Sequence, residues 1–132
     1  MNRTIVLTGI IFGLLAIILG AFGAHGLEKL VDADAIDTFE TGVRYQMYHG
    51  LFLLFLGIWD GLEKSMKKRI YVMILAGVIL FSFSIYLLAL NSLTAFDFKA
   101  IGFLTPIGGV FLILGWIILG QNVINSKKAT IF

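Results

Sequence analysis

Four long apolar stretches constrain the fold of this chain more than any other feature. They cover about residues 4–24, 43–61, 70–91 and 101–121 of the 132 residues. A helix needs about 20 mostly apolar residues to cross a bilayer core of about 30 Å. The stretches therefore predict an all-α fold, an integral membrane bundle of four transmembrane helices that forms a single domain over residues 1–132.

Composition also indicates a membrane environment. Hydrophobic residues make up 59% of the chain and charged residues 14%, whereas soluble domains average about 45–50% and about 25%. The lipid bilayer is therefore the expected partner. The net charge is only +2 and the charges fall in short connectors, so nucleic acid is excluded as a partner. Cysteine is absent, which excludes disulfides and cysteine-based metal sites.

The first stretch has an alternative interpretation as a cleaved signal peptide. Arg3 would be its basic head, and Ala24-His25-Gly26 loosely fits a cleavage site between small residues. However, the apolar run exceeds the usual length of about 7–15 residues, and it carries an ordered pattern of small residues. We therefore expect this stretch to be retained as the first span.

The distribution of charge predicts the orientation. Seven of the ten lysines and arginines lie at the N-terminus, in the second connector and at the C-terminus. Six of the eight acidic residues lie in the first and third connectors or beside them. Because loops rich in lysine and arginine stay in the cytoplasm, we expect both termini on the cytoplasmic side of a bacterial cytoplasmic (plasma) membrane.

The first connector is amphipathic. Its apolar residues recur every four positions, at Leu27, Val31, Ala35, Phe39 and Val43, and acidic residues fill the positions between them. Asp32 or Asp34 is suited to cap a helix here. We expect a short amphipathic helix at the outer surface, between the first and second spans, which then turns or continues into the membrane.

Small residues form stripes on the predicted spans. In the first span they alternate at spacings of four and three, at Gly9, Gly13, Ala16, Gly20 and Gly23, and the fourth span carries Gly108 and Gly109. In lipid, small residues let helices approach closely. We favour packing within the chain, and the alternative is that one stripe serves a homo-oligomer. No pattern identifies another protein partner.

The scarce polar residues fall near one level, in the outer half of the predicted bundle. They are His25, Arg44, Tyr45, Gln46, His49, Asn91 and Thr105. Ionisable residues inside spans are costly and often mark a site, and histidine can relay protons or bind a metal. The alternative is that these groups only fasten the helices together. We favour a functional role for His49 and a structural role for His25.

The start of the fourth span carries a helix signal of its own. Thr105 is suited to cap a helix that has Pro106 at its first position. Residues 101–104 would then be an irregular segment dipping into the outer leaflet, and the alternative is a mild proline kink.

Motifs for catalysis are absent. The sequence has no HExxH motif, no recognisable Ser/His/Asp constellation and no glycine-rich phosphate loop. We therefore expect no enzyme, no catalytic residues, no cofactor and no metal site. Binding or passage of a small solute, ion or proton through the polar cluster is one expected function. A non-catalytic accessory or lipid-organising role is the alternative, and a metal-dependent membrane enzyme is a weaker third.

Four motifs resemble one known family in order and spacing. They are GAFGAHGL (20–27), TGVRYQMYHGL (41–51), FSFSIYLLAL (81–90) and TPIGGVFLILGW (105–116). Together they resemble the domain of unknown function 423 family of small integral membrane proteins. The resemblance implies four spans and retention of the first, and it implies no activity. It directs attention to Gly20, Gly23, His25, Gly26, Tyr45, His49, Thr105, Pro106, Gly108, Gly109 and Trp116.

Overall fold

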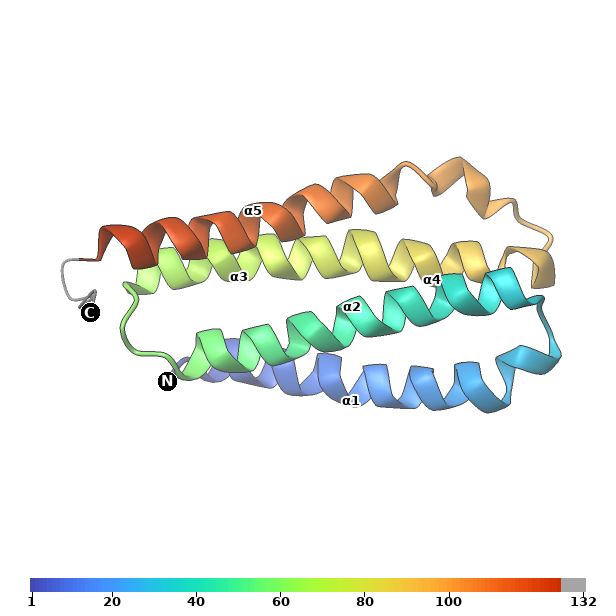
Figure 1. Cartoon of the computed structure of the whole chain (residues 1–132), viewed down its shortest axis with the longest axis horizontal. Coiled ribbons are helices and arrows are strands. Elements are labelled where there is room, and N and C mark those ends of the chain that lie inside the picture. Colours follow the sequence, from blue (N-terminus) through green and yellow to red (C-terminus); the bar gives the residue numbers. More distant parts are fainter. Residues whose placement is uncertain (127–132) are drawn as a thin grey trace.

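The structure is a computed structural model that describes residues 1–126, and these form long helices lying side by side (Figure 1). The long elements are α1 (Arg3–His25), α2 (Ala33–Ile58), α3 (Lys64–Val78), a π-helical turn η2 (Ile79–Phe83), α4 (Ser84–Ala89) and α5 (Leu104–Asn125). Short 3-10 turns lie in the connectors, as η1 (Leu27–Lys29), η3 (Asn91–Leu93) and η4 (Phe98–Ile101). No strand occurs within residues 1–126, so the all-α prediction is confirmed.

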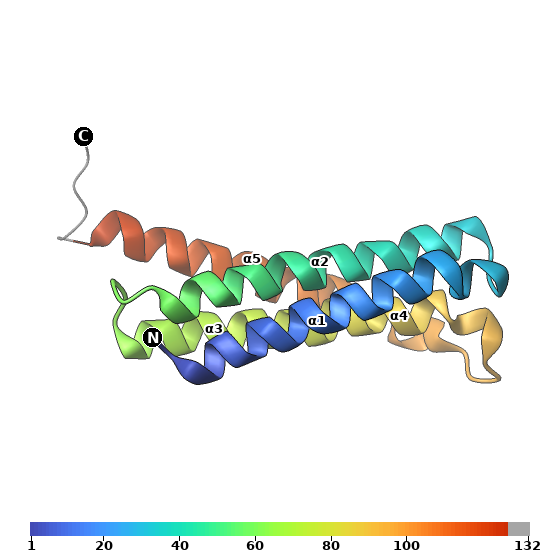
Figure 2. The same ribbon diagram turned by 90° about the horizontal axis from the view of Figure 1, so that it is seen from below.

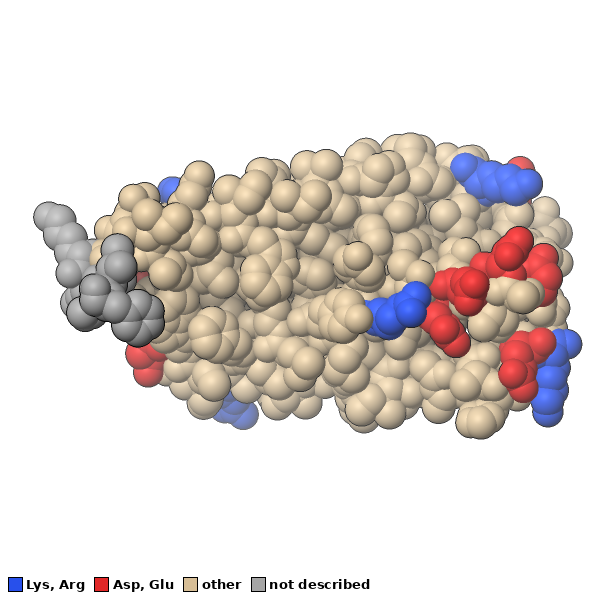
Figure 3. Space-filling model, viewed as in Figure 1, with Lys and Arg blue, Asp and Glu red and all other residues tan. Residues whose placement is uncertain are grey.

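The helices run alternately up and down the long axis (Figures 1 and 2). Helix α1 pairs with α2, α5 pairs with α3, and α2 packs against α3, η2 and α4. We call the end with the N-terminus and residues 59–69 the basic end. The opposite end, with residues 26–40 and 91–103, is the acidic end. Acidic side chains gather at the acidic end, and a broad middle band shows no charged side chain on the face in Figure 3.

Length and composition support three membrane-spanning helices, not the four predicted. The three segments are Arg3–Lys29, Lys64–Ala89 and Phe98–Asn125. By composition α2 is too polar to be counted, because acidic residues occupy its first turns and Arg44, Gln46 and His49 lie within the predicted second span. Large apolar side chains are exposed on the outer helices, as with Ile17 of α1 at 64% and Ile113 of α5 at 59%.

Of the two outcomes that the sequence left open for the amphipathic segment between the first two predicted spans, the structure shows the continuous one and no separate helix. Residues 33–42 form the first turns of the continuous helix α2, which no proline interrupts. Asp32 caps this helix, with its Oδ1 accepting a hydrogen bond of 2.8 Å from the backbone N–H of Ala35. The apolar stripe of this region does turn inward, because Leu27 and Phe39 are buried against Tyr86 of α4.

Helix α5 begins differently from the prediction. It starts at Leu104 rather than after a Thr105 cap, and the turn η4 precedes it. Pro106 still lies in the first turn, where its missing N–H costs no intrahelical hydrogen bond. The Thr105 side chain is therefore free to bond another helix.

The small-residue stripe of α1 faces α2. A Cβ at Gly9 would lie 2.7 Å from the carbonyl oxygen of Gly50, and a Cβ at Gly23 would lie 3.1 Å from the ring of Phe39. Gly13 and Gly20 are less crowded, with their nearest neighbours at 3.9 and 3.4 Å. Ala16 is 1% exposed. The stripe is thus occupied by packing within the chain.

Gly108 makes the corresponding contact in the other half of the bundle. A Cβ there would meet the backbone of Phe81 and lie 2.7 Å from the carbonyl carbon of Leu80, inside the π-helical turn η2. Gly109 is looser, with Phe81 side-chain carbons 3.7 and 3.8 Å away. Helix α5 therefore rests directly on the backbone of the turn.

We expect Gly9→Ala to lower the thermal unfolding midpoint in detergent. The added methyl would meet backbone atoms that cannot rotate away, and overpacking of this kind costs about 1–3 kcal/mol. Gly120→Ala is the matched control, because nothing lies within 4 Å of a Cβ at Gly120. Equal midpoints for the two variants would contradict close packing of α1 on α2.

Candidate functional site

Gln46 of α2 forms side-chain hydrogen bonds with both α1 and α4. Its side chain is 0% exposed, and its Nε2 donates to the carbonyl oxygen of Phe12 in α1 over 2.9 Å. The hydroxyl of Tyr86 in α4 donates to the Oε1 of Gln46 over 2.7 Å. Because a backbone carbonyl can only accept, the orientation of the amide is fixed. Both ends of the amide group are thus used in the bundle.

Two serines connect α4 and the π-helical turn to their neighbours. Ser82 Oγ donates to the carbonyl oxygen of Gly42 in α2 over 2.8 Å. Ser84 Oγ lies 2.5 Å from the carbonyl oxygen of Leu80 and 2.6 Å from the Oγ1 of Thr105 in α5. Since Ser84 gives its one proton to its own helix, Thr105 must donate to Ser84.

His49 is a neutral imidazole with both nitrogens engaged. Its Nδ1 lies 2.7 Å from the carbonyl oxygen of Tyr45, and the Nε1–H of Trp116 donates to its Nε2 over 3.3 Å. A carbonyl only accepts and an indole N–H only donates, so the proton must sit on Nδ1. Binding a metal or a second proton at Nε2 would break the bond to Trp116.

The structure leaves two members of the predicted cluster at the acidic end. His25 is exposed at the last position of α1, and its side chain forms no hydrogen bond with the described part of the chain. Asn91 lies in the connector, where its Oδ1 accepts a 2.7 Å hydrogen bond from the N–H of Phe98. The expected convergence of both residues with Gln46 and His49 does not occur.

Arg44 and Tyr45 lie at the edge of the cluster. Arg44 is exposed and donates from Nη2 to Thr41 Oγ1 over 3.2 Å. Tyr45 is 40% exposed, and its ring lies 4.9 Å from that of Phe81. Of the predicted cluster, only Gln46, His49 and Thr105 therefore form hydrogen bonds between long helices.

The buried polar side chains of the described residues all have hydrogen-bond partners. No buried side-chain nitrogen or oxygen within residues 1–126 lacks a hydrogen-bond partner. No group of three histidine, aspartate or glutamate side chains suited to a metal occurs there. Chemically, this arrangement joins helices and fixes their register.

A model of one protein family matches residues 19–109, and its description is a protein of unknown function, DUF423. The chain belongs to this family. The resemblance noted from the four motifs is thereby confirmed. The matched region contains the whole Gln46–Tyr86 and Ser84–Thr105 network except for Phe12, and it ends before Trp116.

Relatives of known name are similar over most of the chain. The UPF0382 membrane protein of Staphylococcus saprophyticus is 38% identical over 89% of this chain and 93% of the relative. A UPF0382 membrane protein of Staphylococcus aureus is 38% identical, and one of Staphylococcus epidermidis is 36% identical, each over 92% of the relative. The DUF423 protein is therefore a membrane protein. No solved structure matches it.

Four polar partners in the network were not in the predicted polar cluster, namely Ser82, Ser84, Tyr86 and Trp116, although the family resemblance directed attention to Trp116. A signal for two of them exists in the sequence. Ser82 and Tyr86 are four residues apart, as are Gly42 and Gln46, so each pair lies on one helix face. No comparable signal identifies Trp116 as the partner of His49, because the two are 67 positions apart.

We expect Tyr86→Phe to lower the thermal unfolding midpoint, because it leaves the Oε1 of Gln46 buried without its donor. Such a loss costs about 1–3 kcal/mol. Tyr48→Phe is the control, since Tyr48 is 55% exposed and the described residues give it no hydrogen bond. The double variant Gln46→Leu/Tyr86→Phe should lose less than the sum of the two single losses, and strict additivity would contradict the pairing.

Proposed function

We propose that this DUF423 protein is a non-catalytic component of the bacterial cytoplasmic membrane, with an accessory or lipid-organising role. The observation that carries the proposal is the use of its buried polar groups. Gln46, His49 and Ser82 each bond a neighbouring helix, which supports a role in holding the bundle. A rigid bundle then offers its outer surface to other membrane components.

The proposal includes α2 as a fourth membrane span. Helix α2 has 26 residues, which corresponds to about 39 Å at 1.5 Å per residue. It runs between the same two ends as α1 and α3–α4 (Figure 1). Its polar side chains do not argue against burial in lipid, because a polar group at membrane depth is tolerated when the protein satisfies it.

The proposal also includes an orientation with the basic end in the cytoplasm. This end carries Arg3, Lys64, Lys67, Lys68 and Arg69 within the described residues, while Lys127 and Lys128 lie outside them. Lysine and arginine near span ends favour the cytoplasmic side. The acidic end would then face outward.

Transport of a small solute, ion or proton through the polar cluster has less support. A proton relay or a bound ion at His49 needs a free ring nitrogen, and both nitrogens of His49 are engaged. His25 lies too near the end of α1 to complete a path with His49. We therefore favour the accessory role, and stability measurements separate the two.

Replacing His49 tests its fastening role. We expect His49→Ala to lower the unfolding midpoint, because the Trp116 N–H loses its acceptor at a cost of about 1–3 kcal/mol. His25→Ala should stay within about 0.5 kcal/mol, as is usual for exposed positions. A His49→Ala variant that holds or gains stability would instead indicate a residue kept for function, and flux assays in proteoliposomes would then be required.

Cysteine mapping tests the orientation and the crossing of α2. The natural chain has no cysteine, so Ala33→Cys, Glu63→Cys and Ser92→Cys each add one reactive thiol at an exposed position. In right-side-out vesicles, an impermeant maleimide should label positions 33 and 92, and it should label position 63 only after permeabilisation. Labelling of positions 33 and 63 from the same side would show that α2 does not cross.

A further inference from the structure

Two grooves border helix α3 at the basic end. One has a volume of about 390 Å³ and lies between the start of α1 and α3, with Thr4, Ile5, Lys64, Lys68 and Val72 among its lining residues. The other has a volume of about 420 Å³ and lies between α3 and α5, where Arg69 and Ile118 join Lys68 and Val72. Lys68 and Val72 therefore line both grooves.

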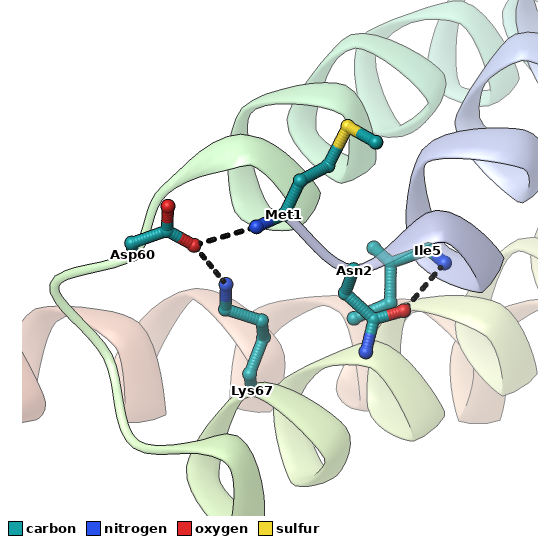
Figure 4. Close-up of polar contacts among 5 residues, drawn as sticks. All are labelled: Met1, Asn2, Ile5, Asp60 and Lys67. Carbon is teal, nitrogen blue, oxygen red and sulfur yellow. Dashed lines mark hydrogen bonds and ion pairs between the residues drawn. The ribbon is translucent and has the colours of Figure 1, made fainter.

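The charge of the nearby acidic residue Asp60 is already compensated by ion pairs within the chain. Its Oδ1 lies 2.8 Å from the ammonium of Met1 and 3.9 Å from the Nζ of Lys67 (Figure 4). The hydrogen bond and charge of the Met1 ammonium hold the pKa of Asp60 below its usual value, and Lys67 adds to this. Asp60 is therefore ionised at neutral pH and paired within the chain.

The lysines and arginine of the grooves have no such counter-charge. Lys64, Lys68 and Arg69 form no ion pair with any residue from 1 to 126. They are exposed, and they lie within two turns of α3. Glu63, next to Lys64, is also exposed and forms no ion pair within residues 1–126. Three unpaired basic side chains thus face one unpaired acidic side chain, so an anion at this surface meets an excess of positive charge.

The first groove changes from polar to apolar along the helix axis, and the second is lined almost entirely by apolar atoms. Lys64 and Val72 are eight residues apart, or about 12 Å along α3. Lys64 lies toward the end of the bundle, while Val72, which is 45% exposed, lies toward its middle. A phosphate group at the membrane surface with hydrocarbon below it has the same order of polar and apolar parts.

We propose that these grooves bind an anionic phospholipid of the cytoplasmic leaflet. Lys64 and Lys68 lie one turn apart on one face of α3 and hold the phosphate, with Arg69 reached from the second groove. The acyl chains lie against Val72, which is 45% exposed, and Ile118. Basic pockets between membrane helices on the cytoplasmic side bind anionic headgroups in this way. The site rests on the proposed orientation, because it requires the basic end to face that leaflet.

Native mass spectrometry of the full chain in detergent tests the site. Phosphatidylglycerol and phosphatidylcholine are titrated separately, and the bound fractions are compared. Wild type should prefer phosphatidylglycerol. Each lysine near an anionic surface contributes about fivefold in affinity, so Lys64→Gln/Lys68→Gln should weaken phosphatidylglycerol binding about thirtyfold and leave phosphatidylcholine unchanged.

A charge-matched control separates the grooves from overall charge. Lys29→Gln/Lys99→Gln removes two lysines from the acidic end and should bind phosphatidylglycerol like wild type. Lys68→Arg should retain binding, and Val72→Gln should weaken it without changing the charge. Unfolding midpoints establish that each variant is folded.

Three outcomes would overturn the proposal. The first is equal binding of the two lipids by wild type. The second is an equal loss in the control pair, which would indicate a general charge effect. The third is displacement of phosphatidylglycerol by millimolar inorganic phosphate, which would indicate a free-anion site. Cysteine labelling reports the orientation independently, so failure of the lipid site is distinguishable from failure of the proposed topology.

Discussion

The bundle depends on how closely α1 and α2 approach where Gly9 meets Gly50. A methyl group at Gly9 would lie 2.7 Å from the Gly50 carbonyl oxygen, so only hydrogen atoms fit between the two backbones. This approach brings the Phe12 carbonyl within 2.9 Å of the Gln46 amide. A longer separation would leave that amide buried and unpaired, which is costly in free energy. The glycine stripe is thus a condition for the polar network, and α2 can carry polar residues because α1 lies so near.

The π-helical turn plays a similar part on the other side of α2. Its backbone lies against Gly108 of α5, and Ser84 just beyond it meets Thr105 at 2.6 Å. π-helical turns inside α-helices occur often at functional sites. Here the hydroxyl of Ser82 in the turn reaches the Gly42 carbonyl, so the irregular segment acts as a junction between three helices.

Much of this architecture follows from the sequence. The apolar runs gave α1, α3–α4 and α5, and the alternating spacing from Gly9 to Gly23 gave the face that α2 covers. For α2, hydropathy does not predict how the polar side chains are accommodated, and the reason is physical. Its polar side chains are bonded to neighbouring helices, and such partners come from distant parts of the chain. The same long separation along the chain hides the pairing of His49 with Trp116. A local signal is easier to recognise: the sequence offered Asp32 and Asp34 as caps of this helix, and Asp32 is the cap.

The stretch GAFGAHG shows how a motif can invite a functional interpretation that packing explains in large part. A Cβ at Gly23 would lie 3.1 Å from the Phe39 ring, and a Cβ at Gly26 would lie 2.9 Å from the Phe22 ring. These two contacts let the chain leave α1, make the turn η1 and bury Leu27 at 0% exposure. His25 lies between them and points to no buried partner within residues 1–126. Its glycine neighbours therefore have a structural reason for their identity and His25 does not, so within this stretch a role beyond packing would rest on His25 alone.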